Sequence, residues 1–389
     1  MKTIAIFTTS RAEFGLLSAL LREIEKSDSV AYRLFVGGAH LAEEYGKTIH
    51  EIEEQKFPIA ATFDFFLNTD TSVSLAKSTA IATYELADLF QHFEFDFVCV
   101  LGDRFELLAI VTNAILFRKP IIHIHGGEST EGAIDEQVRH MITKAAHLHF
   151  VACEEYARNV RRLCEPQWRI HNTGSLAVDN LVHHEKIAKA ELCKRLQLDA
   201  DKSIVFVAYH PVTLELSISP LQQIKNVFAA LKKYDFQIVV TSPNPELDRE
   251  QIIAYIKHEA SQNSRVHYFD SLGTMQYHSL LAHCKFVIGN SSSGILEVPY
   301  FKIPTVNIGD RQQGRVRHPS ILDTDYSVES ITTGIAKALS EDFVSSLRRM
   351  PFKFGDGSAA KKMVEIIKKV QIDQNFLRKR LEFPEHEDE

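Results

Sequence analysis

Short apolar runs alternate along the first part of the chain with longer segments whose apolar residues recur at helical spacing. The first run, TIAIFTT at 3–9, is apolar enough for a buried strand, and AEFGLLSALLREIEKS after it has the period of an amphipathic helix. Similar runs predict four more strands, at 32–38, 95–103, 119–127 and 147–153. This alternation predicts a parallel sheet with helices on both faces.

The pattern starts again after about residue 175. Five further strands are predicted, at 202–211, 236–245, 264–270, 284–289 and 302–310. A length of 389 residues also favours two domains. We therefore predict an α/β protein with two Rossmann-like, doubly wound domains, at 1–175 and 176–365, followed by a C-terminal helix and an acidic, disordered tail at 366–389.

Composition narrows the class of protein. With 45% hydrophobic and 24% charged residues, and with no apolar run of the ~20 residues that a membrane helix needs, the chain is typical of a soluble globular protein. Arg11 and Glu13 follow the first apolar run where a signal peptide would have a cleavage site, so we expect a cytoplasmic protein. The net charge of −7 argues against broad nucleic-acid binding. Five scattered cysteines fit reduced thiols and give no zinc pattern.

Ligands of open α/β sheets bind at the carboxyl ends of the strands, so polar residues just after the apolar runs are the first to consider. The first turn, FTTSRAEFG, lacks the G-x-G-x-x-G of dinucleotide-binding folds, so NAD and FAD are not expected. Arg11 in this turn suits a phosphate, or it is a surface arginine that pairs with Glu13. Asp103 in CVLGDRFE is either a general base or the N-cap of a helix that begins at Arg104.

The segment HIHGGESTEGAIDEQVRH, at 123–140, first suggests a metal site. However, zinc needs three or four fixed ligands, and His123 and His125 on one strand face supply two at most. The Gly-Gly pair allows a sharp exit from the sheet, which would bring Glu128 over its edge. We therefore expect no metal and favour an acid/base role in which Glu128 and Asp135 converge on a substrate.

Other residues of this region have simpler predicted roles. Asp135 and Arg139 are four residues apart on a predicted helix and can pair. Buried, hydrogen-bonded structural roles are the default for four histidines: His123, His140, His147 and His149.

The second half carries a predicted anion site. In IGNSSSGILEVP, a strand ends at Gly289, and a run of serines (Ser291, Ser292 and Ser293) leads into a helix predicted to begin near Ile295. Free backbone N–H groups and hydroxyls there can hold a phosphate. Glu297, one turn inside, either favours the helix dipole or accepts ribose hydroxyls.

Two further features belong to this half. His210 in VAYHPVTLE lies at a strand tip; it faces the same cleft if the domains oppose each other, or it is an ordinary loop histidine. NIGDRQQGRVR adds Arg311, Arg315 and Arg317 after a strand. These are either a solvated basic loop or, as we favour beside a phosphate cradle, diphosphate ligands.

Together these motifs closely resemble one family. SRAEFG, VLGDRFE, the 123–140 segment, NTGSLAVDNL, YHPVTLE, IGNSSSGILEVP and NIGDRQQGRVR occur in this order over most of residues 1–320. They are similar to the hydrolysing UDP-N-acetylglucosamine 2-epimerases of bacterial sialic-acid and legionaminic-acid biosynthesis. The resemblance implies a GT-B-like fold with an interdomain active-site cleft, no cofactor, and conversion of UDP-GlcNAc and water to N-acetylmannosamine and UDP through a 2-acetamidoglucal.

The resemblance also implies residue roles. The acid/base candidates are Asp103, Glu128 and Asp135, with His210 assisting near the pyrophosphate. The UDP-binding positions are Arg11, His210, Ser291, Ser292, Ser293, Glu297, Arg311 and Arg315. A homodimer or homotetramer formed through the N-terminal domain is expected by analogy.

Three other functions are considered. A sister branch acts on UDP-N,N'-diacetylbacillosamine, and residues 38–40 and 62–74 could line the pocket that tells the sugars apart. A GT-B glycosyltransferase would release UDP only with an acceptor present. A non-catalytic nucleotide-sugar sensor would leave the sugar intact, but it would not call for three carboxylates. The role of His125 is left open.

Overall fold

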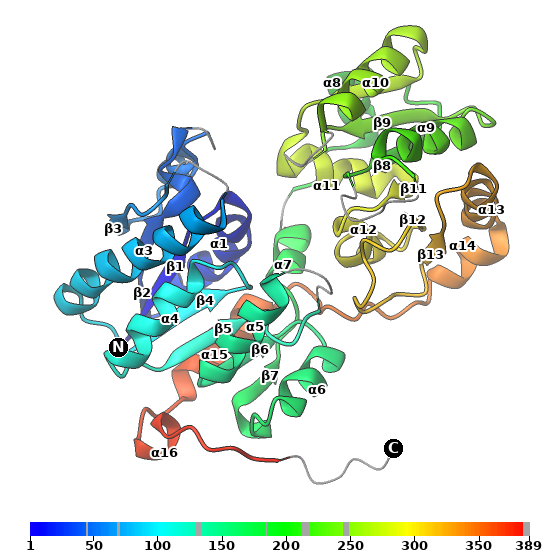
Figure 1. The fold of residues 1–389 in the computed structure, drawn as a ribbon. Coiled ribbons are helices and arrows are strands. Elements are labelled where there is room, and N and C mark those ends of the chain that lie inside the picture. Colours follow the sequence, from blue (N-terminus) through cyan, green and yellow to red (C-terminus); the bar gives the residue numbers. More distant parts are fainter. Residues whose placement is uncertain are drawn as a thin grey trace. The chain divides into compact units, whose positions relative to one another are not determined.

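The computed structural model describes residues 1–43, 46–67, 71–129, 134–183, 185–211, 218–243 and 249–383. Two compact units make up the chain (Figure 1): unit 1 is Met1–Val182 with Lys353–Glu389, and unit 2 is His183–Phe352. Each has one parallel sheet with helices on both faces, so the predicted pair of doubly wound domains is confirmed. Among the described residues, no helix is both long and apolar enough to cross a bilayer.

Unit 1 has a seven-stranded sheet in the order β3-β2-β1-β4-β5-β6-β7. Its strands are β1 Lys2–Thr8, β2 Val30–Gly37, β3 Ile59–Phe63, β4 Phe97–Leu101, β5 Ile121–Ile124, β6 Leu148–Val151 and β7 Ile170–Asn172. Its helices are α1 Arg11–Glu25, α2 Ile49–Glu54, α3 Ser72–His92, α4 Leu107–Leu116, α5 Ile134–Ala145, α6 Glu154–Arg162, α7 Leu176–His183, α15 Ala359–Lys369 and α16 Gln374–Leu377, with short 3-10 turns at Gly38–His40 and Gln167–Arg169.

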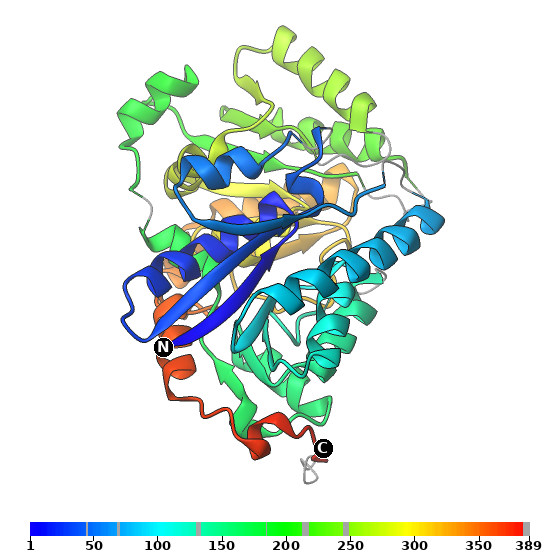
Figure 2. The ribbon, with the colours of Figure 1, turned by 90° about the vertical axis from the view of Figure 1, so that its left-hand side faces the viewer.

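Alternation along β1 divides the core of unit 1 between the two faces of the sheet. Ile4 and Ile6 pack in the cluster formed with α1, α2 and α15, whereas Ala5 and Phe7 pack in the cluster formed with α3, α4 and α5. Figure 2 shows these two helical layers on either side of the β1–β2 ribbon. Because both faces are covered, the strands read as continuous apolar runs, which is why the sequence pattern found them.

Unit 2 has a six-stranded sheet in the order β10-β9-β8-β11-β12-β13. Its strands are β8 Ile204–Ala208, β9 Gln237–Thr241, β10 Val266–Phe269, β11 Cys284–Gly289, β12 Thr305–Ile308 and β13 Ile321–Thr324. Its helices are α8 Lys189–Leu196, α9 Pro220–Leu231, α10 Arg249–Gln262, α11 Gly273–His283, α12 Ser293–Leu296, α13 Val328–Leu339 and α14 Glu341–Leu347, with a 3-10 turn at Val298–Phe301.

The predicted domain boundaries need correction. The predicted second domain ended at residue 365, but the chain returns to unit 1 at Lys353, and α15 packs in the β1 core through Met363 and Ile367. Two backbone N–H groups at the start of α15 donate to the buried Asp179 carboxylate, at 2.9 and 2.7 Å. Of the C-terminal helix and acidic tail predicted at 366–389, the structure has the end of α15 and the single-turn α16; residues 378–383 follow outside any helix, and residues 384–389 lie outside the described part.

All ten predicted strands are present, and three more were missed. The missed strands β3, β7 and β13 each lie at an edge of a sheet. An edge strand is covered less completely, so its residues are more polar and its apolar run is shorter; β7, for example, is only Ile-His-Asn.

Candidate active site

The Gly-Gly exit from β5 has the predicted sharp geometry. His125, directly after the strand, has φ +67°, and Gly127 has φ +78°. A Cβ added to Gly127 would lie 2.3 Å from the carbonyl oxygen of Tyr156, so only glycine fits there. The chain then turns, and the side chain of Glu128 is only 12% exposed.

A buried arginine on α5 contacts two of the three predicted acids, Asp103 and Glu128. The Arg139 side chain is 2% exposed, pairs with Asp103, and donates to Glu136 at 2.6 Å. It also donates to the backbone carbonyl of Glu128 at 2.8 Å. Asp103 follows β4 and Glu128 follows β5, and these strands are neighbours, so the two acids share one edge of the sheet as predicted.

Asp135 lies in the first turn of α5, beside this group. Among the described residues, Arg139 forms its ion pairs with Asp103 and Glu136, so the predicted pair with Asp135 is wrong. Partial burial raises the pKa of Asp135, and the charge of Asp103 raises it further, although Arg139 acts in the opposite direction. Asp135 is thereby suited to hold a proton at a higher pH than an ordinary aspartate.

Asp103 is not a helix cap. The helix α4 begins at Leu107, and its N-cap position is Glu106, so the cap role considered for Asp103 is wrong. Glu106 is 1% exposed and accepts from Arg104 at 2.6 Å. The charged residues of the DRFE motif therefore form a second ion pair beside Asp103, which the sequence interpretation did not assign.

Glu13 extends the group of acids toward β1. Its carboxylate, 5% exposed, accepts from the backbone N–H and the hydroxyl of Thr9, at 2.8 and 2.7 Å. Burial raises the pKa of Glu13 to about 7, the charge of Glu106 adds to the rise, and that of Arg104 opposes it. We did not predict this role, although Glu13 stands in the SRAEFG motif.

Arg11 does not join this group. It is the first residue of α1, is 63% exposed, and pairs with Glu51 at 3.0 Å rather than with Glu13. The sequence alternative that paired it with Glu13 is wrong, because the Glu13 carboxylate turns back to Thr9.

The histidines divide into structural and exposed ones. His123 is buried between Gly102, whose carbonyl accepts from Nε2 at 2.8 Å, and Thr143, whose hydroxyl lies 3.1 Å from Nδ1. His149 is buried beside Glu165 at 3.2 Å, and His147 Nδ1 accepts the N–H of Ile121, so the structural role holds for all three. It is wrong for His140, which is 45% exposed and pairs with Glu136. Within the described ranges, no group of three or more His, Cys, Asp and Glu side chains could hold a metal.

In unit 2, the buried Asn290 joins the loops after two neighbouring strands. Its Oδ1 accepts the N–H of His210 at 2.7 Å, and its Nδ2 donates to the His210 carbonyl at 2.8 Å. Gln312 donates to the Asn290 carbonyl at 2.9 Å, and Arg311 donates to it at 3.4 Å. Three predicted motifs thus meet at a residue that we had not singled out. Burial lowers the pKa of His210 to about 4, and Arg311 lowers it further, so its imidazole is neutral at pH 7.

The serine run follows a close approach of two strands that only glycine allows. Gly289 has φ +142°, and a Cβ there would lie 2.0 Å from the carbonyl oxygen of Ala208. The three serines are half-buried, and the Ser291 and Ser293 hydroxyls lie 3.2 Å apart.

The helix that follows was predicted two residues too late. The single-turn α12 begins at Ser293, and Glu297 is its C-cap rather than a residue of its first turn, so the helix-dipole role proposed for Glu297 is wrong. Glu297 accepts from the Tyr277 hydroxyl at 3.0 Å, and burial raises its pKa to about 7.

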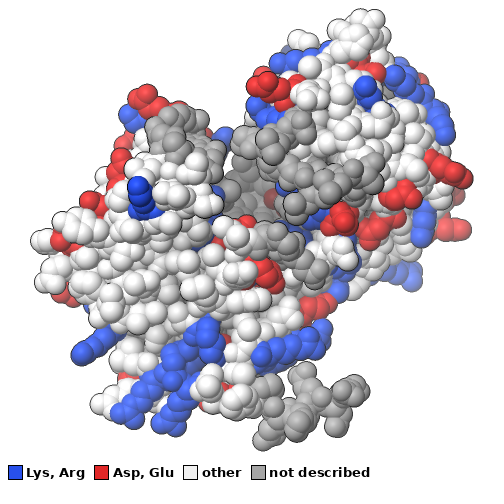
Figure 3. All heavy atoms as spheres, in the orientation of Figure 1, with Lys and Arg blue, Asp and Glu red and all other residues white. Residues whose placement is uncertain are grey.

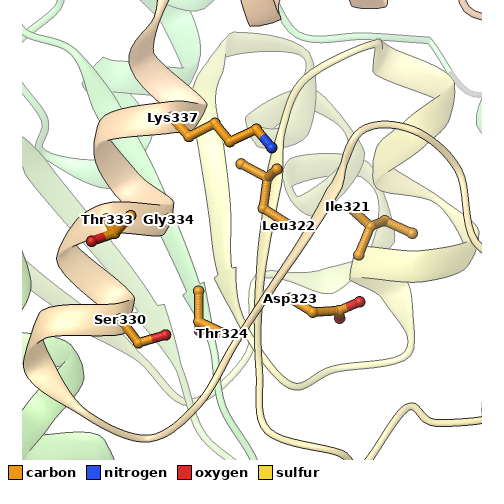
Figure 4. Close-up of a pocket in the computed structure, with 8 residues that line it drawn as sticks. All are labelled: Ile321, Leu322, Asp323, Thr324, Ser330, Thr333, Gly334 and Lys337. Atoms are coloured by element: carbon orange, nitrogen blue, oxygen red, sulfur yellow. The ribbon is translucent and has the colours of Figure 1, made fainter.

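The arginines after β12 differ from one another. Arg317 pairs with Asp323 at 3.2 Å, on the edge strand β13. Arg315 is half-exposed and makes no hydrogen bond or ion pair to another described residue. A separate pocket between β13 and α13, lined by Asp323, Ser330, Thr333, Lys337 and their neighbours (Figure 4), contains none of the predicted site residues.

Two units with parallel sheets, one carrying acids at its strand tips and the other carrying small polar loops, place this chain in the class of GT-B-like α/β proteins. The sequence model of the UDP-N-acetylglucosamine 2-epimerase family matches residues 22–368, and the chain belongs to this family. It is 36% identical to the Campylobacter jejuni GDP/UDP-N,N'-diacetylbacillosamine 2-epimerase (hydrolyzing), over 88% of each chain. It is 33% identical to the Escherichia coli polysialic acid biosynthesis protein P7, over 95% of this chain and 94% of that protein. The fold is similar to that of the Neisseria meningitidis UDP-GlcNAc 2-epimerase bound to UDP-GlcNAc, with a TM-score of 0.74 and 18% identity over 95% of this chain and 100% of that one.

Proposed function

We propose that this protein is a hydrolysing 2-epimerase of a UDP-2-acetamido sugar, which converts UDP-GlcNAc and water to N-acetylmannosamine and UDP. The observation that carries the proposal is the placement of three acids near Arg139: Asp103 and Glu128 follow two neighbouring strands and contact the guanidinium through a carboxylate and a backbone carbonyl, and Asp135 lies in the first turn of α5. Family membership supports the same chemistry.

The reaction requires several acids and bases. A base removes the C2 proton while the C1–O bond to UDP breaks, which gives 2-acetamidoglucal and UDP. Water then adds its hydroxyl to C1, and C2 receives a proton on the opposite face. The C2 proton is weakly acidic, so the first step needs a positioned base and a stabilised leaving group, and the second needs a proton donor.

The contacts of the three acids suit different steps of this reaction. Asp103 is paired with the buried Arg139 guanidinium, which holds its carboxylate in one position, as a base that removes the C2 proton requires. Asp135, with its raised pKa, suits the role of proton donor to C2. Glu128 is the third proton carrier, and its side chain is held by the imidazole of His125, whose Nδ1 lies 2.6 Å from Glu128 Oε1.

For UDP, we propose the loops that meet at Asn290. A neutral His210 keeps one ring N–H, which can donate to a phosphate oxygen. Arg315, which has no partner among the described residues, can pair with a phosphate without breaking an existing ion pair. The other proposed ligands are Ser291, Ser292, Ser293, Glu297 and Arg311, and also Arg11, which would have to exchange its exposed pair with Glu51.

A second substrate has a specific observation in its favour. The 36% identical relative from Campylobacter jejuni is named for N,N'-diacetylbacillosamine. UDP-N,N'-diacetylbacillosamine is therefore the second candidate; its reaction at C1 and C2 would be the same. Residues 38–40 are described, and His40 there is buried, so it does not line an open pocket; residues 68–70 of the other proposed segment lie outside the described part.

The test is incubation with each UDP-sugar in deuterated water, without metal or acceptor, followed by NMR of the sugar. Free N-acetylmannosamine with deuterium at C2 is the expected product from UDP-GlcNAc. Faster turnover of the diacetamido sugar would reassign the substrate and keep the reaction. Release of UDP only with an added acceptor, or binding with no turnover of either sugar, would refute an epimerase in favour of a transferase or a sensor.

A further inference from the structure

The backbone of His125 has a conformation that is unusual for histidine. Its φ of +67° lies in the left-handed region, and the residue stands between the last residue of β5 and the Gly-Gly pair. Residues with a side chain visit this region infrequently and are held there by surrounding contacts. Glycine would adopt this backbone conformation without strain, so the presence of a histidine indicates that the imidazole has a role of its own.

The imidazole contacts a proposed catalytic carboxylate. His125 Nδ1 lies 2.6 Å from Glu128 Oε1, and the two side chains are only 13% and 12% exposed. This separation is at the short end of charge-assisted hydrogen bonds, which are the strong ones. The other ring nitrogen, Nε2, is buried and has no hydrogen-bond partner among the described residues. The ring is therefore oriented by its contact with Glu128 and not by a bond at its far side.

Helix α5 supplies a second anchor for Glu128, through Arg139. Arg139 donates to the Glu128 backbone carbonyl at 2.8 Å, which fixes the main chain of the residue. The bond from Nδ1 fixes the end of its side chain. The left-handed turn at His125 is what brings the imidazole back over a residue only three positions later.

We propose that His125 is a positioning residue for Glu128. Its Nδ1–H donates to the carboxylate and holds Oε1 in one orientation, so that the acid meets the sugar in its reactive geometry. This inference rests on the proposed function, in which Glu128 carries a proton. A misplacement of about 1 Å costs on the order of 100-fold in rate, and this is the loss expected when the anchor is removed.

Two variants test whether the hydrogen bond from Nδ1, and not the rest of the imidazole ring, is what matters. His125→Gly relieves the backbone conformation and removes the donor, so the protein should fold, bind UDP with a Kd within about 2-fold of wild type, and lose kcat by about 100-fold. In His125→Asn, the amide Nδ2 is bonded to Cγ as Nδ1 is, and asparagine tolerates the left-handed region. This variant should recover most of the lost kcat.

The chain offers a matched control. His50 Nδ1 lies 3.1 Å from Glu53 Oε2, with the same spacing of three residues, but these side chains are 63% and 56% exposed. His50→Gly and His50→Asn should both retain wild-type kcat and KM. Thermal unfolding of all four variants shows whether each is folded.

The outcomes distinguish this inference from the proposed function. If the wild-type protein turns over a UDP-sugar and His125→Gly does so at the same rate, the positioning role is overturned and the function stands. If His125→Asn is as slow as His125→Gly, the effect does not run through Nδ1, and the proposal is also overturned. No turnover by the wild-type protein would remove the function and the positioning role together.

A readout independent of turnover is the ¹⁵N NMR spectrum of the histidine rings. The Nδ1 signal of His125, identified by its loss in His125→Asn, should move in Glu128→Gln, because the acceptor changes from a carboxylate to an amide. The same signal should not move in Glu53→Gln. A His125 signal that is unchanged in Glu128→Gln would overturn the contact itself.

Discussion

The buried Glu13 gives the sharpest test of the electrostatics of unit 1. Its pKa rises from 4.5 to about 7 because its carboxylate is buried, with Glu106 nearby. The folded protein therefore keeps a proton on Glu13 in a pH range where the unfolded chain has released it. The contribution of this proton to the free energy of unfolding is fully present below pH 4.5 and is lost as the pH rises through about 7.

Glu13→Gln removes this loss. Glutamine mimics the protonated acid, since its carbonyl oxygen can accept from Thr9 as Oε2 does now. Each pKa unit corresponds to ~1.36 kcal/mol, so the variant should be about 3 kcal/mol more stable than wild type above pH 7 and equal to it near pH 4. With a urea m-value of ~3 kcal/mol/M, the midpoint should rise by about 1 M.

The assay follows the single tryptophan of the chain. Trp168 lies in unit 1, where the Arg169 guanidinium stacks 4.2 Å from its ring centre, so its fluorescence reports on the unfolding of this unit. Urea curves of wild type and variant are compared from pH 4 to 8, with the exposed Glu53→Gln as control. A difference that stays constant across this range, or a variant that loses stability as the pH rises, would refute the reasoning.

Three more predictions concern other parts of the chain. Arg139→Met should lower kcat/KM by about 100-fold or more. In the wild-type protein Arg139 lowers the pKa of Asp135, so in this variant the limb of the pH–rate profile that belongs to Asp135 should move to higher pH. A limb that does not move would show that Asp135 does not titrate in the reaction. Gly289→Ala should destabilise unit 2 by about 3 kcal/mol and weaken UDP binding, because its Cβ would lie 2.0 Å from the Ala208 carbonyl oxygen. Gly15→Ala, which has open space around its Cβ, should change neither quantity. Circular dichroism measures the stability, and calorimetry measures the UDP binding. Light scattering should show a dimer or tetramer, because α3 and α4 expose the large side chains of Tyr84 and Leu116, each by more than 70%. Leu116→Arg should weaken this association. A wild-type protein that is monomeric at tens of micromolar would contradict the prediction.

The buried strands could be predicted because each is apolar on both faces. What local pattern could not show is where the chain returns after residue 352. The last segment is attached to unit 1 by contacts with residues far away in sequence: Arg169 donates to the carbonyls of Phe376 and Arg378, and Lys2 donates to three carbonyls at the end of α15. Figure 3 shows Lys and Arg side chains gathered around this end of unit 1, near α6 and α16. No periodicity in a sequence records such pairings.

Part of the site could be predicted from one rule about parallel sheets. Because carboxyl ends of parallel strands share an edge, Asp103 and Glu128 could be placed together, as could His210 and the serine run. The residues that join them were missed. Arg139 and Asn290 act through bonds to several loops at once, and their positions become visible only when those loops are in place. The left-handed φ of His125 was missed for a different reason: histidine adopts this region more often than most side-chain residues, but too rarely for a single position to be predicted from it.

The carboxylates of unit 1 raise a physical question that Arg139 answers. Acids placed at neighbouring strand tips repel one another, and partial burial makes each charge more costly. A site that needs several of them must supply positive charge from within. Arg139 does so from a position that is itself only 2% exposed, and its planar group reaches Asp103, Glu136 and the Glu128 main chain in different directions. Asp135 receives the field of this charge without a direct bond to Arg139, and its pKa stays raised because burial and the charge of Asp103 outweigh the opposing effect of the guanidinium. One guanidinium can thus hold neighbouring acids in place while Asp135 keeps a raised pKa, which suits a reaction that removes a proton at one step and returns one at another.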